Sequence, residues 1–265
     1  MSTSIFAKIE SYDVQPNGIV RPSAIFKLFQ KAAGDDLDNF NMSFELLHEN
    51  NIAFVLTKLT IKFYDNINVY DDIKIITRPR NNKGVYFIRD YDLFVNGNRV
   101  AYATSHWVII DVSTRKLLRP DSLSNLGEIP PDLTECIVLD DKRIKFDENS
   151  LQRTDVREVY YSQIDRNGHM NNTFYPDIVF DYLPDSFKSS LKDKTITVYY
   201  ISELMQGQKF DVFTLTTDTD FRFLAKNSIT GKDIFTALID FWFIVYYNYI
   251  VKFHERIEFL WLNPW

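Results

Sequence analysis

Residues 16–23 read PNGIVRPS and residues 166–173 read RNGHMNNT, so one short pattern occurs twice at a separation of 150 positions. Each copy follows a tyrosine-containing segment and leads into an apolar stretch. Asn-Gly is a strong turn signal, and apolar residues that recur at three and four positions are typical of a helix with one buried face. The repeat therefore predicts a turn followed by a helix at two places in the chain.

Two later pairs of segments repeat in the same order. The sequence LTIKF at 59–63 matches ITVYY at 196–200, and a shorter pair, at 73–75 and 210–212, has the same separation of 137 positions. Matches of this length are weak singly, but their shared order indicates an internal duplication. We expect a first half over about residues 5–118, a linker over 119–154, a related second half over 155–241 and an aromatic tail over 242–265.

The first half predicts one helix and several strands. Apolar residues over 25–33 recur with helical spacing, and Gly34 is expected to end this helix. Over residues 53–64 apolar and polar side chains alternate, which is typical of a strand with one covered face. Further strands are predicted at 73–76, 85–95 and 100–111, the last two joined by an Asn96-Gly97 hairpin.

The second half repeats this arrangement. We predict a helix over about 173–183, followed by strands near 195–201, 209–217, 220–226 and 233–241. A helix wrapped by a curled antiparallel sheet, made twice in one chain, is the double hot-dog arrangement. The expected fold class is therefore α+β, with two antiparallel sheets that each wrap around a central helix.

The overall charge argues against nucleic acid as a partner. The 265 residues include 30 Lys and Arg against 36 Asp and Glu, so the net charge is −6 and no whole-molecule field attracts a polyanion. The single cysteine, Cys136, excludes an intramolecular disulfide and any zinc site that needs two thiolates, and it is consistent with a reducing compartment. We predict no metal site and no cofactor.

Two segments bear on localisation. Residues 1–8 lack the apolar core of a secretory signal, so we expect the protein in the cytoplasm. Residues 241–251 are uncharged and mostly aromatic, but a membrane span needs about 20 residues. Extending this segment back to Ile234 would place Asp240 in hydrocarbon at a high energetic cost. We therefore predict no transmembrane span.

The segment before the second predicted helix gathers groups that can carry chemistry. Asp165, Asn167 and His169 alternate, so in an extended loop their side chains would point to one side. A carboxylate can act as a base or nucleophile, an imidazole exchanges protons near neutral pH, and an amide can orient either group. The N–H groups at the start of the helix favour an oxyanion. This set suits hydrolysis of an activated carbonyl.

A purely structural interpretation of the same segment stays open. Asn167 and Gly168 would form a turn, Asn172 would cap the helix, and His169 would be a polar loop residue. However, the first copy of the repeat has Ile19 in place of His169, so the turn does not require an imidazole.

Several separated motifs carry a resemblance to a known family. In the first half they lie at 12–18, 28–30, 54–58, 89–91, 103–111 and 114–115, and in the second half at 165–172 and 199–203. These motifs occur in the same order in the acyl-ACP thioesterases of plant plastids and bacteria, which the chain resembles over about residues 5–241. The resemblance implies a double hot dog with the acyl pocket in the first half. It also implies hydrolysis of the thioester that joins a fatty acyl group to acyl carrier protein.

The resemblance also implies roles for individual residues. Asp165 corresponds to the catalytic carboxylate, with Asn167 and His169 beside it, and Glu203 corresponds to the family's glutamate on the following strand. Leu204 stands where some members have cysteine, so we expect no thiol nucleophile. Our hypothesis is that Asp165 activates water or attacks the thioester carbon, while Glu203 positions the water or tunes the local charge. For Glu203, an exposed residue at a strand end is the plainer interpretation.

A basic cluster offers a docking surface for the carrier. Arg78, Arg80, Lys83 and Arg89 are the densest group of positive charges and would attract an acidic carrier protein; a solvated loop is the alternative. For the function itself, an acyl-CoA thioesterase, a non-catalytic acyl-carrier binder and a hydratase of enoyl thioesters remain alternatives. The aromatic tail at 242–265 could be a packed extension, a contact in a homodimer, or sequence not selected for this fold.

Overall fold

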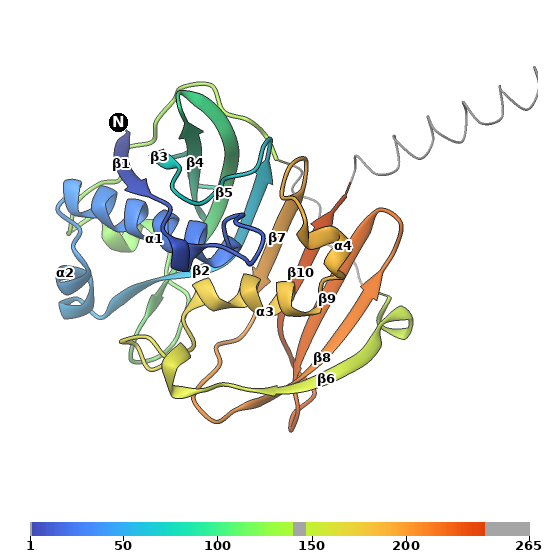
Figure 1. Cartoon of the computed structure of the whole chain (residues 1–265). Coiled ribbons are helices and arrows are strands. Elements are labelled where there is room, and N and C mark those ends of the chain that lie inside the picture. The colour runs from blue at the N-terminus through green and yellow to red at the C-terminus, as the bar shows by residue number, and fades with distance from the viewer. Residues whose placement is uncertain (1, 140–146, 242–265) are drawn as a thin grey trace, which may run out of the picture.

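The computed structural model describes residues 2–139 and 147–241, so the predicted aromatic tail at 242–265 lies outside the described residues. Ten strands form one antiparallel sheet in the order β1-β3-β4-β5-β2-β7-β10-β9-β8-β6 (Figure 1). Their bounds are β1 Thr3–Lys8, β2 Ile52–Phe63, β3 Asp72–Pro79, β4 Phe87–Val95, β5 Asn98–Asp111, β6 Gln152–Glu158, β7 Thr195–Tyr200, β8 Lys209–Thr216, β9 Asp220–Asn227 and β10 Asp233–Asp240. The α-helices are α1 Pro22–Asn39, α2 Phe44–Glu49, α3 Tyr175–Tyr182 and α4 Asp185–Lys188.

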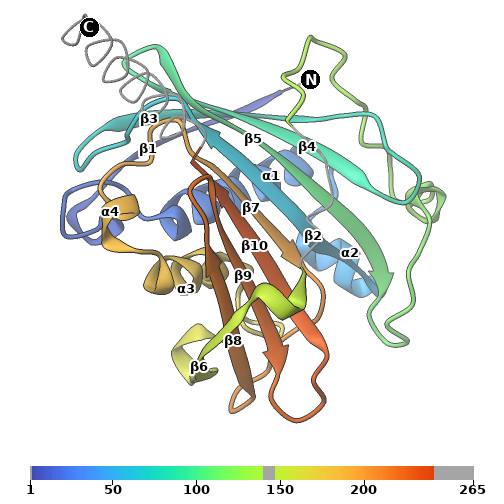
Figure 2. The same cartoon turned by 90° about the vertical axis from the view of Figure 1, so that its right-hand side faces the viewer.

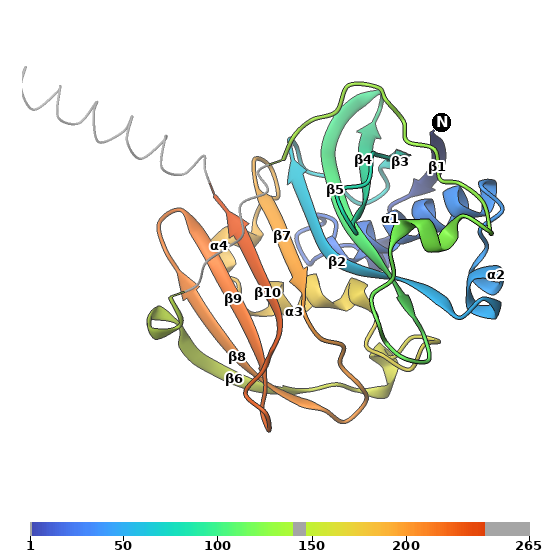
Figure 3. The same ribbon diagram turned by 180° about the vertical axis from the view of Figure 1, so that it is seen from behind.

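The two long helices lie on the same face of the sheet. Figure 1 shows α1 and α3 in front of the strands, and the view from behind in Figure 3 shows β2, β7 and β10 covering them. The backbone N–H of Ser23 in α1 donates to Asp177 Oδ1 in α3 at 3.3 Å, so the helices also contact each other. No helix within the described residues is long and apolar enough to cross a membrane.

The pairing of β2 with β7 joins the halves edge to edge. Its register sets Thr60 opposite Thr197 and Ile61 opposite Ile196, and the two threonine hydroxyls lie 3.2 Å apart in the buried centre of the seam. Figure 2 shows β2, β7 and β10 side by side in one twisted sheet. The predicted pair of antiparallel sheets is therefore continuous, and each half of the sheet wraps its own helix.

Helix α1 does not end at Gly34 as predicted but continues to Asn39. The reason lies two residues beyond the glycine, at the buried carboxylate of Asp36. Thr3 Oγ1 in β1 donates to Asp36 Oδ1 at 2.5 Å, and Arg89 Nη1 in β4 donates to Asp36 Oδ2 at 2.6 Å. These contacts fix the last turns of α1 to two strands, which offsets the modest helix penalty of glycine.

Two edge strands, β1 and β6, and two short helices, α2 and α4, are absent from the sequence prediction. Strand β1 buries only Ile5, and β6, which begins inside the stretch predicted as linker, buries none of its seven side chains. Neither strand shows the strict apolar alternation that marks a half-buried strand. Helix α2 begins with Ser43, whose Oγ accepts from the Leu46 N–H at 3.2 Å, but its six residues are too few for a periodic signal.

The core has two parts. The larger runs through both halves between the helices and the sheet, and its largest fully buried side chains include Phe29, Phe63, Tyr91, Phe223 and Phe235. The smaller lies beneath α2 and is closed by the first part of the linker, with Met42, Leu47, Ile52, Ile109 and Leu123 buried. The linker is also held further along, where Arg80 Nη1 donates to the carbonyls of Asp132 and Thr134 at 2.9 and 2.7 Å.

The Asp36–Arg89 pair gives a test of this fold. The Arg89→Met substitution leaves the carboxylate of Asp36, which is 1% exposed, without its cationic partner. Loss of one member of a buried ion pair costs about 3–5 kcal/mol, so the free energy of unfolding in urea is expected to fall by that amount. Arg153→Met is the matched control, because Arg153 is 57% exposed in its pair with Asp211 and should cost less than about 1 kcal/mol. Equal losses in the two variants would contradict this account of α1.

Candidate active site

The segment that carries Asp165 is a tight turn rather than an extended loop. The Asp165 N–H donates to the His169 carbonyl at 2.9 Å, and the Gly168 N–H donates to the Asp165 carbonyl at 3.0 Å. Gly168 has φ +79°, a left-handed conformation that glycine adopts without steric cost. The Asn167 N–H donates to Asp165 Oδ1 at 2.8 Å, so one carboxylate oxygen is fixed by the turn itself. The structural and chemical interpretations of this segment thus coexist.

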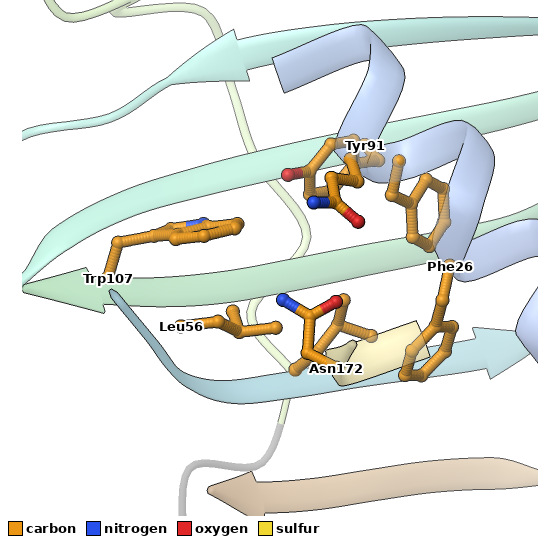
Figure 4. A pocket seen from close by; sticks show the side chains of 8 residues that line it. Phe26, Leu56, Tyr91, Trp107 and Asn172 are labelled. Carbon is orange, nitrogen blue, oxygen red and sulfur yellow. The ribbon is translucent and has the colours of Figure 1, made fainter. Parts of the chain in front are cut away.

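The start of the following helix is capped by Asn171, not by Asn172. Asn171 Oδ1 accepts from the backbone N–H of Thr173 at 2.9 Å and from its hydroxyl at 2.8 Å. Asn172 is left to line the space between the two halves. Figure 4 shows its amide among Phe26, Leu56, Tyr91 and Trp107. This pocket has a volume of about 10 Å³, which is room for no more than one water molecule.

The structure brings His169 and Glu203 into contact. Glu203 Oε2 lies 3.3 Å from His169 Nε2. The turn and the segment after β7 are held together by the Met170 N–H, which donates to the Leu204 carbonyl at 2.7 Å. Arg115, from the turn after β5, also donates to Glu203 Oε2. The sequence analysis gave Arg115 no role beyond its place in a motif.

A much larger cleft, with a volume of about 940 Å³, runs between the halves. Asp165, Asn167, His169 and Glu203 all line it. The rest of its lining comes mainly from α1, α2, β2, β4 and the linker, where the apolar side chains of Leu37, Met42, Leu47, Phe54, Phe87 and Ile129 lie among charged ones such as Lys31, Asp35, Glu45 and Arg80. The cleft therefore combines a polar end in the second half with an apolar surface in the first, as a ligand with a reactive head and a hydrocarbon chain requires.

Two tyrosines lie under the polar end of the cleft. Burial raises the pKa of the Tyr175 hydroxyl, and the negative charges of Glu203 and Asp165 raise it further. The hydroxyl therefore stays protonated at neutral pH and can serve as an uncharged hydrogen-bond donor. Tyr200, whose ring lies 5.1 Å from that of Tyr175, donates its hydroxyl to the Asn172 carbonyl at 3.1 Å. The sequence analysis missed Tyr175 because it lies in the apolar pattern of a helix.

The predicted basic docking cluster does not form one exposed surface. Arg78 pairs with Asp92, Arg80 pairs with Asp90 at 2.6 Å, and Arg89 is buried against Asp36; only Lys83 is well exposed. The sequence analysis counted positive charges along the chain, whereas the partner carboxylates lie on the neighbouring strand or on α1. Because Arg78, Arg80 and Arg89 are paired and largely buried, the geometry gives no support to carrier docking at this cluster.

Comparison with known structures places this architecture among acyl-ACP thioesterases. The acyl-ACP thioesterase from Bacteroides thetaiotaomicron has a TM-score of 0.79 at 22% identity, covering 90% of this chain and 97% of that one. The 12:0-ACP thioesterase from Umbellularia californica has a TM-score of 0.73 at 17% identity, covering 90% and 96%. At these identities the similarity establishes the fold, and it confirms the predicted hot-dog arrangement.

Sequence comparison identifies the family. The chain is 25% identical over 250 residues to oleoyl-acyl carrier protein thioesterase 2, chloroplastic, from Arabidopsis thaliana. The match covers 85% of this chain and about 65% of that relative's length. The family model of the acyl-ACP thioesterase N-terminal domain matches residues 5–122, and that of the C-terminal domain matches residues 146–242. The two models follow the two halves of the sheet and cover most of the chain, which therefore belongs to the acyl-ACP thioesterase family.

Proposed function

We propose that this protein hydrolyses the thioester bond of fatty acyl-[acyl carrier protein] and releases the free fatty acid. The observation that carries the proposal is the composition of the cleft. Asp165, His169 and Glu203 line it from the second half, and apolar side chains make up much of its lining from the first half. Family membership supports acyl carrier protein as the carrier. We also propose that the acyl chain lies along the first half, against the side chains of α1, α2 and β2.

In this mechanism Asp165 supplies the reactive carboxylate. Its Oδ1 is held by the Asn167 N–H, and no hydrogen bond from the described residues reaches its Oδ2. Oδ2 can therefore take a proton from water as the water oxygen attacks the thioester carbon, or attack that carbon directly. In the first route the C–S bond breaks, the fatty acid forms, and the proton held by Asp165 passes to the departing thiolate. In the second route the C–S bond breaks as Oδ2 forms a mixed anhydride with the acyl group; water then hydrolyses the anhydride, which regenerates the carboxylate, releases the fatty acid and supplies the proton that the thiolate takes up. Leu204 provides no thiol at this place.

The neighbouring groups orient the reaction. His169 Nε2 lies 3.3 Å from Glu203 Oε2, so the carboxylate can hold the imidazole in one orientation toward the cleft. Asn167 contributes its backbone N–H to Asp165, while its exposed amide remains available to the substrate.

Thiol release from medium- and long-chain acyl carrier proteins and from the matching acyl-CoAs tests the proposed reaction. For Asp165→Asn we expect a fall in kcat of about 10²- to 10⁴-fold, because the amide cannot accept the proton or form the mixed anhydride with the acyl group. Asp185→Asn is the matched control and should keep wild-type activity, since Asp185 is 97% exposed on α4 and its ion pair within the described part of the chain is with Lys188. Circular dichroism checks that both variants keep the fold.

The outcomes separate the alternatives. Faster hydrolysis of the carrier-protein thioesters supports the proposal, and faster hydrolysis of the acyl-CoAs supports an acyl-CoA thioesterase with the same site. Mass spectrometry distinguishes a hydratase, because hydration adds water to an enoyl chain and leaves the thioester intact. Full activity in Asp165→Asn would overturn the assigned mechanism, and no product from any substrate would favour a non-catalytic carrier binder.

The Tyr175 hydroxyl gives a second test. Tyr175→Phe removes a buried, protonated donor near Asp165 and Glu203 but keeps the packed ring, so we expect kcat to fall about tenfold with little change in melting temperature. Tyr182→Phe is the control, because it loses a hydrogen bond of 2.6 Å to Asp155 on the exposed side of α3. Equal activity in the two variants would exclude a role for the Tyr175 hydroxyl.

Thiol chemistry can be excluded directly. The chain has one cysteine, Cys136, which is exposed in the linker. We expect iodoacetamide to alkylate Cys136 to completion, as measured by intact mass, while the rate of thioester hydrolysis stays within about twofold of the untreated enzyme. The Cys136→Ser variant should behave in the same way. Inactivation that follows alkylation in the wild type but not in Cys136→Ser would contradict this prediction.

A further inference from the structure

Arg115 belongs to the first half of the chain but contacts the proposed catalytic groups of the second. It follows β5, and its guanidinium forms an ion pair with Glu203, 88 residues further along the chain. Arg115 also lines the large cleft beside His169. The contact therefore crosses between the halves at the polar end of the cleft.

The backbone at Arg115 is in an unusual conformation. Its φ is +59°, in the left-handed region that is costly for residues other than glycine and, to a lesser degree, asparagine and aspartate. The surrounding turn enforces it, because Asp111 Oδ1 accepts from the backbone N–H and hydroxyl of Thr114 at 2.7 and 2.8 Å. Asn51 Nδ2 donates to Asp111 Oδ2 at 2.7 Å, and the Arg115 N–H donates to the Asp111 carbonyl at 2.8 Å. A conformation determined by so many contacts is typical of functional positions.

The same carboxylate oxygen of Glu203 meets two groups. Oε2 accepts from Arg115 Nη2 and lies 3.3 Å from His169 Nε2. Glu203 lies beyond the last paired residue of β7, and its side chain is 37% exposed, so no strand ladder holds it and packing surrounds it only in part. The ion pair with Arg115 is a charge-assisted hydrogen bond that fixes this carboxylate from the other half of the chain.

Stability alone does not account for this ion pair. The side chains of Arg115 and Glu203 are 47% and 37% exposed, and exposed ion pairs contribute little to folding. The strained turn at Arg115 therefore does little for folding, and its effect is to hold Glu203 in a precise position.

We propose that Arg115 is a positioning residue that holds Glu203 against His169, so that the active site is complete only when both halves contribute. The inference rests on the proposed function of the cleft. Arg115 acts through Glu203 and does not touch the reacting atoms.

Steady-state kinetics of thiol release from acyl carrier protein tests the inference. Arg115→Met should lower kcat about 10- to 100-fold with KM nearly unchanged, because a small misplacement of a catalytic group has an effect of this size. Arg115→Lys keeps the charge and should recover part of the loss. Lys116→Met is the matched control, since it removes the same charge from the next residue, whose exposed side chain makes no contact with Glu203.

The double variant tells whether Arg115 acts through Glu203. In a Glu203→Gln background, Arg115→Met should cause no further loss of kcat, because the group that it positions is already absent. Multiplicative losses would overturn the inference. A rise in KM with unchanged kcat would also overturn it and would indicate that Arg115 binds an anionic part of the carrier.

A readout without substrate separates this inference from the proposed function. The chain has four histidines, so the ring NMR signals of His169 can be assigned by their loss in His169→Gln. Arg115→Met and Glu203→Gln should both move these signals, and Lys116→Met should not. If the signals move but no substrate is hydrolysed, the proposed function fails and the positioning role stands. If hydrolysis proceeds and the His169 signals are the same in Arg115→Met and wild type, the positioning role fails alone.

Discussion

The pairing of β2 with β7 is the contact on which the rest of the molecule depends. It turns two half-sheets into one, fixes their register at Thr60 and Thr197, and brings α1 and α3 together on one face. It also sets the turn that carries Asp165 opposite α2 of the first half. There Arg166 lies 3.2 Å from the centroid of the Phe44 ring, so the two halves meet again at the cleft.

The duplicated turn separates what the fold needs from what the chemistry needs. In the first half Gly18 has φ +81°, and the Gln15 N–H donates to the Ile19 carbonyl at 2.7 Å, which is the geometry of the second turn. The residue equivalent to His169 is Ile19, which is 6% exposed and packs in the core. Both halves therefore require the turn and its glycine, and only the second uses the same positions for polar groups that line the cleft.

The two halves contribute different properties to the cleft. The second supplies carboxylates and an imidazole near buried tyrosines, whose raised pKa keeps the hydroxyl groups uncharged. The first supplies many apolar side chains together with charged ones, and among these the Arg115 guanidinium reaches across to Glu203. Strand β2 has a bulge between Leu56 and Lys58, and Leu56 lines both the small pocket and the large cleft. Local irregularities of this kind commonly redirect side chains at functional sites.

Periodicity in the sequence determined most of the fold. Strand β3, which alternates buried and less buried side chains, the apolar-rich strands β2 and β5, and the bodies of α1 and α3 follow from the pattern of apolar residues. The edge strands β1 and β6 bury too few side chains to leave that signal. The predicted end of the helix at Gly34 was wrong because the residues that hold Asp36 lie on strands distant in the sequence. Local spacing predicts an element well only where the element buries a regular face.

The candidate active site likewise has a part that could be predicted from sequence and a part that could not. Asp165, Asn167 and His169 lie within five residues, so their grouping could be predicted from sequence alone, and family resemblance added Glu203. The roles proposed for Arg115 and Tyr175 could not be predicted in this way. Nor could the pairing of the basic cluster with carboxylates, because each of these depends on which charged group lies nearby in space. Arg115 meets Glu203 across 88 residues only because β2 pairs with β7. The sequence determined which chemical groups the protein has, and the tertiary structure decided which of them are buried, paired or free to react, because electrostatic interactions depend on distance in space and on exclusion of water.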